Sequence, residues 1–306
     1  MKHFKTISAY CKGINISAPK HPHFDIRSFE ENMTTVAPQM SVFRHEFYAI
    51  AIKAGGDGKA MTGHFADFPE GTTVFFNTPF QLLSWNIVPN WQGYYLMFSQ
   101  DFVAQSHILS QILKLFPFLK IEQSIPFEVP PSELPVILSV YQNIWNEYNG
   151  TAADKFQIIE AHVYLLLSLI KRLFEQQVDD KMSSIGLKTT NLQLLSRYQT
   201  LIQTSFYQDT PPTPSANLHS TSYYSNQLHI HPNHLNAVVK KLTGITALNH
   251  IHHHLLMLAK AYLAQTTWSI KEIAYTLYFD SPNNFSSFFK KRTGKTPLEY
   301  RQKTHL

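Results

Sequence analysis

Residues 281–297, SPNNFSSFFKKRTGKTP, combine amide, hydroxyl and cationic side chains with regularly spaced phenylalanines. Phe285, Phe288 and Phe289 fall at i, i+3 and i+4, a spacing that predicts an amphipathic helix with one apolar stripe. The asparagine, serine and lysine side chains then point outward. Asparagine can bond adenine N6 and N7 together, and lysine suits phosphate oxygens or guanine, so this face has the chemistry of DNA recognition. For a single helix, a plain solvated face is the alternative.

Start and stop signals bracket this helix. Ser281 is expected to cap it, because its hydroxyl can accept a hydrogen bond from a free amide of the first turn. Pro282 occupies the first helical position, where the missing N–H costs nothing. Gly294 supplies the left-handed residue that ends many helices, and Pro297 prevents the helix from resuming soon after.

The same design occurs fifty residues upstream, in HPNHLNAVVKKLTGIT, residues 231–246. The two segments share seven identities over the fifteen columns that begin at Pro232. Leu235, Val238 and Val239 repeat the apolar stripe. Packing constrains only the inward face of a helix, so a repeated outward face favours two copies of one recognition surface.

A shorter helix is predicted before each copy. Residues 269–277, SIKEIAYTL, have apolar residues at helical spacing behind a capping serine, Ser269, and residues 221–228 are a weaker version. A short helix, a turn and a second helix with a polar N-terminal half make a helix-turn-helix, whose second helix enters the major groove.

Residues 188–303 resemble the DNA-binding domain of the AraC/XylS family of bacterial transcription regulators. The resemblance rests on residues 269–301, which are similar to the family's I-x-E-I-A, F-x-x-x-F-K-K and T-G-x-T-P-x-x-Y-R patterns. That family joins two helix-turn-helix units by one long helix, and residues 248–267 occupy its place. The resemblance implies a sequence-specific transcription regulator with units at about 219–244 and 269–294 that read successive major grooves.

The resemblance also implies particular DNA contacts. It assigns base-edge contacts to Asn233, Asn236 and Ala237 in the first unit and to Asn283, Asn284 and Ser287 in the second. Phosphate contacts are expected from Lys240, Lys241, Lys290, Lys291 and Arg292.

Three features depart from the family pattern. Tyr278 replaces the turn glycine and is strained if the backbone keeps a positive φ there. Leu255 stands where the long helix usually carries an arginine. Ala237 and Ser287 fall where longer polar side chains are common, so backbone contacts and DNA shape are expected to carry more of the binding.

Charge is distributed unevenly along the chain. Residues 188–306 hold twelve Lys and Arg against four Asp and Glu, whereas residues 1–187 hold fourteen against seventeen, which together give the net charge of +5. A cationic C-terminal part is expected if only that part contacts phosphates. We predict a cupin-like sensor and dimerisation domain at 1–177, a linker at 178–187 and an AraC-type DNA-binding domain at 188–306.

The N-terminal half has a different pattern. Between residues 42 and 98, short aromatic and β-branched runs are broken by Gly, Pro and Asn, which predicts the strands of a small barrel or sandwich. Helices are expected at about 101–118, 132–148 and 154–176, and a proline-rich loop at 208–215 within the DNA-binding domain. The predicted class is α+β: an N-terminal cupin-like β-barrel with following helices, then an all-α domain with two helix-turn-helix units.

The helix at 154–176 is apolar over more than half of its circumference, which is more than one neighbour need cover. Part of it is therefore expected to form a two-fold dimer contact. Its apolar residues are Ile158, Ile159, Leu165, Leu166, Leu169, Ile170 and Leu173.

Residues 43–50 and 77–85 are similar to the cupin-like sensor half of many AraC-type regulators, in which the barrel holds a small effector. The candidates for lining an effector pocket are Trp85, Trp91, Tyr94 and Tyr95, with ordinary core packing as the alternative. No metal is expected, because three ligands are needed and the sequence shows only one, His45, with Phe43 and Leu83 in place of histidines. No cofactor is predicted.

Four histidines, His250 and His252 to His254, lie in the long helix. His250 and His254 are one turn apart, which is compatible with metal binding, but no carboxylate is close in sequence. Solvated or phosphate-facing histidines are the expected interpretation.

Composition bounds the remaining possibilities. The 306 residues, 44% of them hydrophobic, can form two ordinary domains. The single cysteine, Cys11, excludes an internal disulfide framework and a cysteine-based zinc site. The first residues lack a secretory pattern, and the longest apolar stretch, 163–170, is too short to cross a bilayer, so a cytoplasmic location is expected.

The expected partners are double-stranded DNA, a second copy of the chain and a small-molecule effector; RNA polymerase is left open and no membrane is expected. Two other classes also stay open, a cupin-type enzyme with a DNA-targeting tail and an architectural DNA-binding protein. No catalytic residue is predicted, since no Ser/His/Asp or Cys/His arrangement is evident, and the chain is not expected to be an enzyme. A bound metal would favour the enzyme, and a base-specific footprint would exclude the architectural protein.

Overall fold

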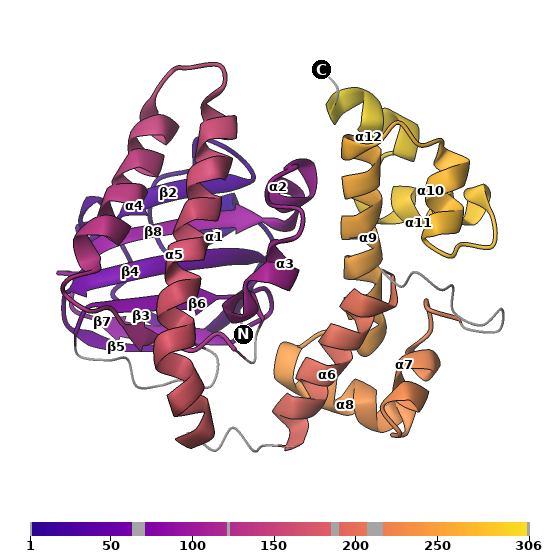
Figure 1. Ribbon diagram of the computed structural model, residues 1–306, viewed down its shortest axis with the longest axis horizontal. Coiled ribbons are helices and arrows are strands. Elements are labelled where there is room, and N and C mark those ends of the chain that lie inside the picture. Colours follow the sequence, from indigo (N-terminus) through magenta and orange to yellow (C-terminus); the bar gives the residue numbers. More distant parts are fainter. Residues whose placement is uncertain (1, 63–70, 121–122, 185–189, 207–216, 305–306) are drawn as a thin grey trace. The chain divides into compact units, whose positions relative to one another are not determined.

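The computed structural model describes residues 2–62, 71–120, 123–184, 190–206 and 217–304 (Figure 1). The chain forms two compact units, one made of residues 1–103 and 111–187 and the other of residues 104–110 and 188–306. The loop predicted at 208–215 and the end of the predicted linker, 185–187, lie outside the described residues. The predicted α+β class is confirmed, with a sheet-rich first unit and a helical second unit.

The described strands of the first unit form two sheets (Figure 1). A four-stranded sheet has the order β1-β3-β7-β5 and a five-stranded sheet the order β2-β8-β4-β6-β9. The strands are β1 (Lys2–Phe4), β2 (Phe24–Ser28), β3 (Gln39–His45), β4 (Phe47–Gly55), β5 (Gly58–Thr62), β6 (Thr73–Asn77), β7 (Leu83–Ile87), β8 (Gln92–Ser99) and β9 (Phe127–Glu128). Except for the parallel pair β1 and β3, the paired strands are antiparallel.

Strand β4 lies at the centre of the larger sheet and is apolar along most of its length, because both of its faces are buried. The outer face of the larger sheet is covered by helices: α4 (Leu134–Asn149) packs on β2 and β8, and α5 (Lys155–Ser184) packs on α4 and β9 (Figure 1).

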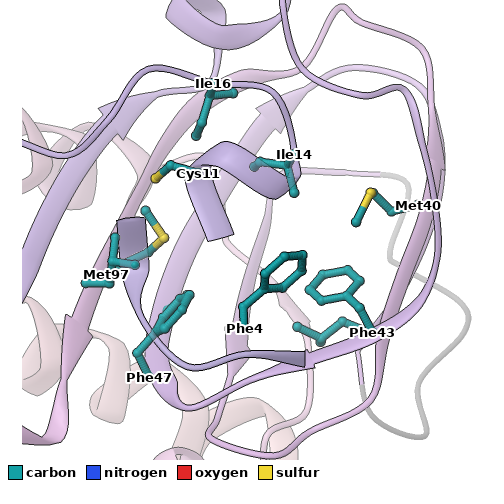
Figure 2. Packing of buried hydrophobic residues seen from close by; sticks show 11 residues of the cluster. Phe4, Cys11, Ile14, Ile16, Met40, Phe43, Phe47 and Met97 are labelled. Carbon is teal, nitrogen blue, oxygen red and sulfur yellow. The ribbon is translucent and has the colours of Figure 1, made fainter. Parts of the chain in front are cut away.

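The core of the first unit gathers under the N-terminal helix α1 (Ile7–Gly13), as Figure 2 shows. Thr6 caps this helix by accepting a hydrogen bond from the amide of Ala9 at 3.1 Å. Cys11 is buried within this cluster. A helix of two turns gives too short a periodic pattern for sequence reasoning to find.

Two helical predictions need correction. The single helix expected at 101–118 is instead α2 (Gln100–Gln105), α3 (Ile112–Leu115) and the 3₁₀ turn η2 (Pro117–Leu119). Pro117 cannot donate within a helix, and Ser106 starts a separate turn by accepting from the amide of Leu109 at 3.0 Å. Helix α5 runs on to Ser184, so most of the expected linker is helical. A further 3₁₀ turn, η1 (Glu30–Asn32), follows β2.

The second unit is helical. Its elements are α6 (Thr190–Ser205), α7 (Thr221–Gln227), α8 (Pro232–Thr243), α9 (Ala247–Gln265), α10 (Ile270–Thr276), α11 (Pro282–Thr293) and α12 (Pro297–Thr304). The long helix α9 joins two helix pairs, α7–α8 and α10–α11, which lie at its opposite ends (Figure 1). Leu255, at the position where an arginine was expected, is fully buried in the middle of α9. In the part of the chain that the structure describes, no helix is long and apolar enough to cross a membrane.

Candidate DNA-binding surface and barrel cavity

The two predicted helix-turn-helix pairs are present, and polar caps define their helices. Ser269 and Glu272 form a reciprocal capping box at the start of α10, with distances of 2.6 and 3.1 Å. Ser281 caps α11 as predicted, accepting from the amide of Asn284 at 3.2 Å. The first copy uses a histidine instead, since His231 Nδ1 accepts from the amide of Asn233 at 3.2 Å at the start of α8.

Most of the identities between the two copies serve the fold. The prolines open α8 and α11, and Gly244 and Gly294 end them with the same left-handed φ of 76°. Thr243 Oγ1 donates to the carbonyl of Val239 at 2.7 Å, and Thr293 makes the equivalent bond at 2.9 Å.

The threonines that follow begin the next helices. Thr246 caps α9 by accepting from the amide of Asn249 at 3.3 Å, and Thr296 accepts from the amide of Glu299 at 3.3 Å at the start of α12. With the prolines, glycines and preceding threonines, four of the seven shared columns are therefore explained by local structure.

Three shared columns remain without a structural role, and all six of their side chains are exposed. They are Asn233 and Asn283 near the N-terminal ends of α8 and α11, and Lys240, Lys241, Lys290 and Lys291 near the C-terminal ends. The repeated outward face thus consists of an amide at one end of the helix and two cations at the other.

The other candidate base contacts differ in accessibility. Ala237, Asn284 and Ser287 are exposed. Asn236 is half-buried, and its Oδ1 accepts from the amide of Ala247 at 3.1 Å, so this carboxamide fastens α8 to the start of α9.

Arg292 is exposed but has partners of its own. Its guanidinium lies 4.8 Å from the centre of the Phe288 ring and is hydrogen-bonded to His252 Nδ1. A cation–π contact and a hydrogen bond hold this side chain to the protein, unlike the four exposed lysines.

Both turns pass through left-handed backbone at a residue other than glycine. His229 has φ of 56° and Tyr278 has φ of 60°. The next amides close the turns in the same way, from Ile230 to the carbonyl of Ser225 at 3.0 Å and from Phe279 to that of Ala274 at 2.9 Å. The strain expected at Tyr278 is therefore present, because the backbone has the positive φ of the family's turn but a tyrosine stands in place of the glycine.

Solvated or phosphate-facing histidines were expected in α9, but His250 and His254 instead pack within the second unit. His250 is buried, with Nε2 2.9 Å from Thr243 Oγ1, and burial lowers its pKa to about 3. His254 packs on Phe206, with ring centres 5.6 Å apart, and burial lowers its pKa to about 4. Sequence reasoning missed these roles because α9 packs on both helix pairs and has little free surface. Among the described residues, no three His, Cys, Asp or Glu side chains are grouped to hold a metal ion.

A cavity of about 90 Å³ lies inside the first unit, with walls from both sheets. It lies between two clusters of packed apolar residues, one around Phe43 and Phe47 and the other around Phe29 and Phe75. Its lining includes small residues from both sheets, Ala49 and Ala51 on β4 and Ala60 on β5. Short side chains at these positions leave the space that larger ones would fill.

The effector candidates divide by strand face. Trp85 and Trp91 line the cavity, and each indole N–H is satisfied by a backbone carbonyl, at 2.9 Å from Ala37 and 2.8 Å from Asp57. Tyr95 also lines it, whereas its neighbour Tyr94 points to the other face of β8.

Tyr94 meets helix α4 there. Its hydroxyl is hydrogen-bonded to Gln142, and its ring stacks against that of Tyr141. Two further polar lining residues, Asn32 and His45, were missed, because nothing in the sequence marks them as close to the tryptophans.

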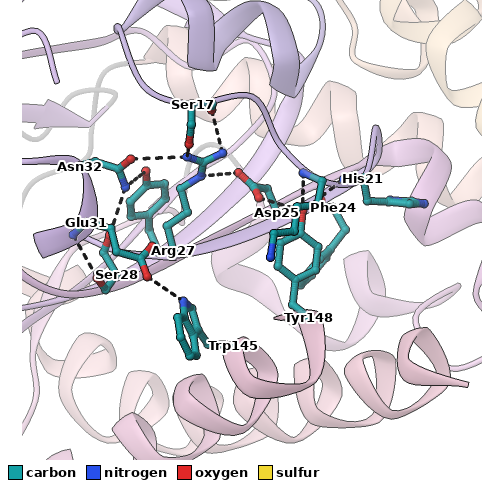
Figure 3. A network of polar contacts seen from close by, with 12 residues as sticks. Ser17, His21, Phe24, Asp25, Arg27, Ser28, Glu31, Asn32, Trp145 and Tyr148 are labelled. Atoms are coloured by element: carbon teal, nitrogen blue, oxygen red, sulfur yellow. Dashed lines mark hydrogen bonds and ion pairs between the residues drawn. The ribbon is translucent and has the colours of Figure 1, made fainter. Parts of the chain in front are cut away.

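A buried polar network joins one wall of the cavity to helix α4 (Figure 3). Asn32 donates to the Tyr95 hydroxyl at 3.1 Å, and its Oδ1 accepts from Arg27 at 3.4 Å. Arg27 pairs with Asp25 at 2.7 Å, and Asp25 accepts from the hydroxyl of Tyr148 on α4 at 2.9 Å. A continuous chain of polar contacts through Arg27 and Asp25 therefore connects Asn32 to Tyr148 on α4.

Comparison with known proteins supports the helix-turn-helix assignment. A helix-turn-helix domain family matches residues 224–303. The HTH-type transcriptional regulator YtdP of Bacillus subtilis is 37% identical over 78 residues, which are 26% of this chain and 10% of that protein. The bifunctional transcriptional activator and DNA repair enzyme AdaA of the same organism is 36% identical over 78 residues, 26% of this chain and 37% of that protein. The chain thus spans well under half of either relative.

Solved structures of one protein extend over most of the chain. ToxT from Vibrio cholerae is 15% identical and covers 92% of this chain and 97% of its own, with a TM-score of 0.33.

Proposed function

Because this chain has the AraC-type helix-turn-helix domain at its C-terminal end, we propose that it is a sequence-specific transcription regulator with a small-molecule sensor in its N-terminal unit. The observation that carries the proposal is the repeated exposed face of α8 and α11. Once the residues that cap and terminate the helices are set aside, Asn233 and Asn283 and two lysine pairs are what the copies share.

Position along the helix assigns a role to each group. The N-terminal part of a recognition helix contacts base edges in the major groove, and the two asparagines stand there. The lysine pairs stand about two turns further along each helix, at positions suited to phosphate oxygens. Asn284, Ser287 and Ala237 are proposed as further base contacts, because each is exposed on the same helices.

The sensor role is supported by the cavity and by the network that leaves it. The cavity is lined by aromatic and aliphatic side chains with a few polar groups, the composition usual for small-molecule sites. Asn32 lines it and is connected through Arg27 and Asp25 to Tyr148 on α4. A ligand that displaces Asn32 would bias the position of α4, and so would act through unequal affinity for two states.

A homodimer through α5 is proposed from the surface of that helix. Of the apolar residues named above, Ile159, Leu166, Ile170 and Leu173 are buried, whereas Ile158 and Leu165 are 37% and 45% exposed. The exposed pair is two turns apart on one face, which suits a two-fold contact between copies.

Leu165→Glu should give a monomer in light scattering at tens of micromolar protein. Gln157→Glu, exposed on the same helix outside this stripe, should stay dimeric. A monomeric unmodified chain, unaltered by DNA, would exclude the dimer.

The regulatory function is tested by selecting binding sites for the full chain from random duplex DNA. We expect an enriched motif with two conserved blocks about one helical turn apart, one for each recognition helix. Failure to enrich any motif, with binding that depends only on salt, would instead favour the architectural protein.

A further inference from the structure

The cavity between the two sheets has a chemistry that restricts its ligand. None of its described lining residues is a lysine, arginine, aspartate or glutamate. Arg27 lies behind Asn32, and its charge is compensated by Asp25 at 2.7 Å. Lys53 lies two residues beyond Ala51 on the same face of β4, and its Nζ stands over the Trp91 ring at 5.6 Å.

These surroundings disfavour a charged ligand of either sign. A buried carboxylate would meet no cation in the lining and would lose its hydration without compensation. A ligand cation could use the aromatic walls, but Lys53 already holds its positive charge at Trp91 and no lining carboxylate offsets a second one.

The imidazole of His45 differs from two hydrogen-bonded pairs in the cavity wall. Asn32 is paired with Tyr95, and Thr62 with Asn77 at 3.1 Å. His45 is 1% exposed and stacks on Phe47 with ring centres 4.0 Å apart.

The Nδ1 atom of His45 is buried and makes no well-formed hydrogen bond to any described residue. Burial lowers the pKa of the imidazole to about 3, although the nearby backbone of Phe47 acts in the opposite direction. The ring is therefore neutral at physiological pH and is able to exchange one hydrogen bond with an uncharged partner.

We infer that the cavity binds an uncharged, largely apolar small molecule that carries one hydrogen-bonding group, such as a hydroxyl, directed at the imidazole of His45. This inference rests on the proposed sensor function and names the chemical class of its effector. The aromatic and aliphatic walls would supply most of the affinity, and His45 would select for the polar group.

Four probes of similar size separate the alternatives: benzyl alcohol, toluene, benzoate and benzylammonium. Binding is measured on the full chain without DNA, by ligand-observed NMR. Benzyl alcohol should bind about tenfold more tightly than toluene, the size of one net hydrogen bond to a buried group. Benzoate and benzylammonium should show no binding at the same concentrations. Absence of binding by all four probes, or a preference for either ion, overturns the inference.

Variants locate the bound probe. His45→Phe keeps the stacked ring and should bind toluene as before while losing the tenfold preference for benzyl alcohol. Ala51→Leu should fill the cavity and weaken both neutral probes, and Tyr94→Phe, on the opposite face of β8, should change neither. Unfolding midpoints of the variants show whether each one is folded. Preference for benzyl alcohol that survives His45→Phe contradicts the assignment.

Lys53→Met addresses the remaining cation near the cavity. If the unmodified chain binds benzoate and Lys53→Met does not, the ligand is an anion and the inference is wrong. Because these measurements use no DNA, a failure here is distinct from failure of the chain to select a DNA motif.

Discussion

The two helix-turn-helix copies share a backbone but differ in what supports it. In the first copy Asn236 fastens α8 to α9 through the amide of Ala247. At the corresponding positions the second copy has Ser286 and Pro297, and the proline has no N–H to donate. The second copy instead holds Arg292 against Phe288 and His252, where the first has a leucine. Residues that differ between the copies thus support each one separately, and the shared exposed residues are left for a common ligand.

The largest expected effect concerns the shared asparagines. Asn283→Ala should lose about 1–3 kcal/mol of binding free energy on the selected site and little on random DNA, because the proposed bidentate base contact would be lost. Asn233→Ala should lose a similar amount through the other half of the site. Lys290→Ala is the matched control: it should weaken binding to all DNA and reduce the salt slope by about one. Equal losses on both DNAs for Asn283→Ala would make it a phosphate contact. Competition titrations measure all three.

A second difference between the copies concerns a titratable group, the imidazole of His250. His250 bonds to Thr243 in the first copy, whereas Tyr300 stands at the corresponding position in the second. Burial lowers the pKa of His250 to about 3 in the folded chain. Below pH 6.5 the unfolded chain therefore binds more protons than the folded chain, and the free energy of unfolding decreases as the pH is lowered.

Between pH 7 and pH 5 this loss should reach up to about 2 kcal/mol in the first copy. Amide hydrogen exchange should accelerate in α8 more than in α11, and His250→Gln should reduce the difference. Equal acceleration of α8 and α11 would show that His250 does not control the first copy.

A smaller effect tests the role of Asn236. Asn236→Ala should lower the free energy of unfolding by about 1 kcal/mol, because the amide of Ala247 loses its acceptor. Asn236→Asp keeps an acceptor and should retain most of the stability, and Ser286→Ala in the second copy should change little. Denaturant unfolding checks all three. Unchanged stability in Asn236→Ala would show that Asn236 does not stabilise the fold, and a DNA contact would then be its remaining proposed role.

The smallest effect lies in the turns. His229→Gly should stabilise the protein by about 0.5–1 kcal/mol, since glycine adopts φ of 56° without strain and the side chain is exposed. Tyr278→Gly should gain less, because the ring packs against Phe206 with centres 6.1 Å apart. Thermal unfolding gives the comparison, and a loss of stability in His229→Gly would contradict it.

The sequence could predict both recognition helices because they carry a double signal, a helical period and a repeated pattern. Ser281, Pro282 and Gly294 were identified by their local conformational preferences. The repeat by itself could not separate residues that serve the fold from those left exposed. That separation needed the hydrogen bonds of Thr243 and Asn236, which are set by tertiary packing.

The two sheets of the first unit were predictable only as a class. Aromatic and β-branched runs indicated β4, β6, β7 and β8, but not the order of the strands, which depends on pairings between distant segments. The cavity depends on which inward positions carry alanine, and alanine in a strand gives no signal of its own. The sequence likewise gives no signal that His45 lines the cavity, because the other lining residues come from distant segments in both sheets.

The most direct test of the account is a hydroxyl-radical footprint of the full chain on a selected site, compared with those of Asn233→Ala and Asn283→Ala. Two protected blocks are expected on one face of the duplex, centred about 34 Å apart. Each substitution should weaken protection in one block, and the two substitutions should affect different blocks. A single block, or two blocks that both variants weaken equally, would contradict the claim that α8 and α11 read DNA as two copies of one surface.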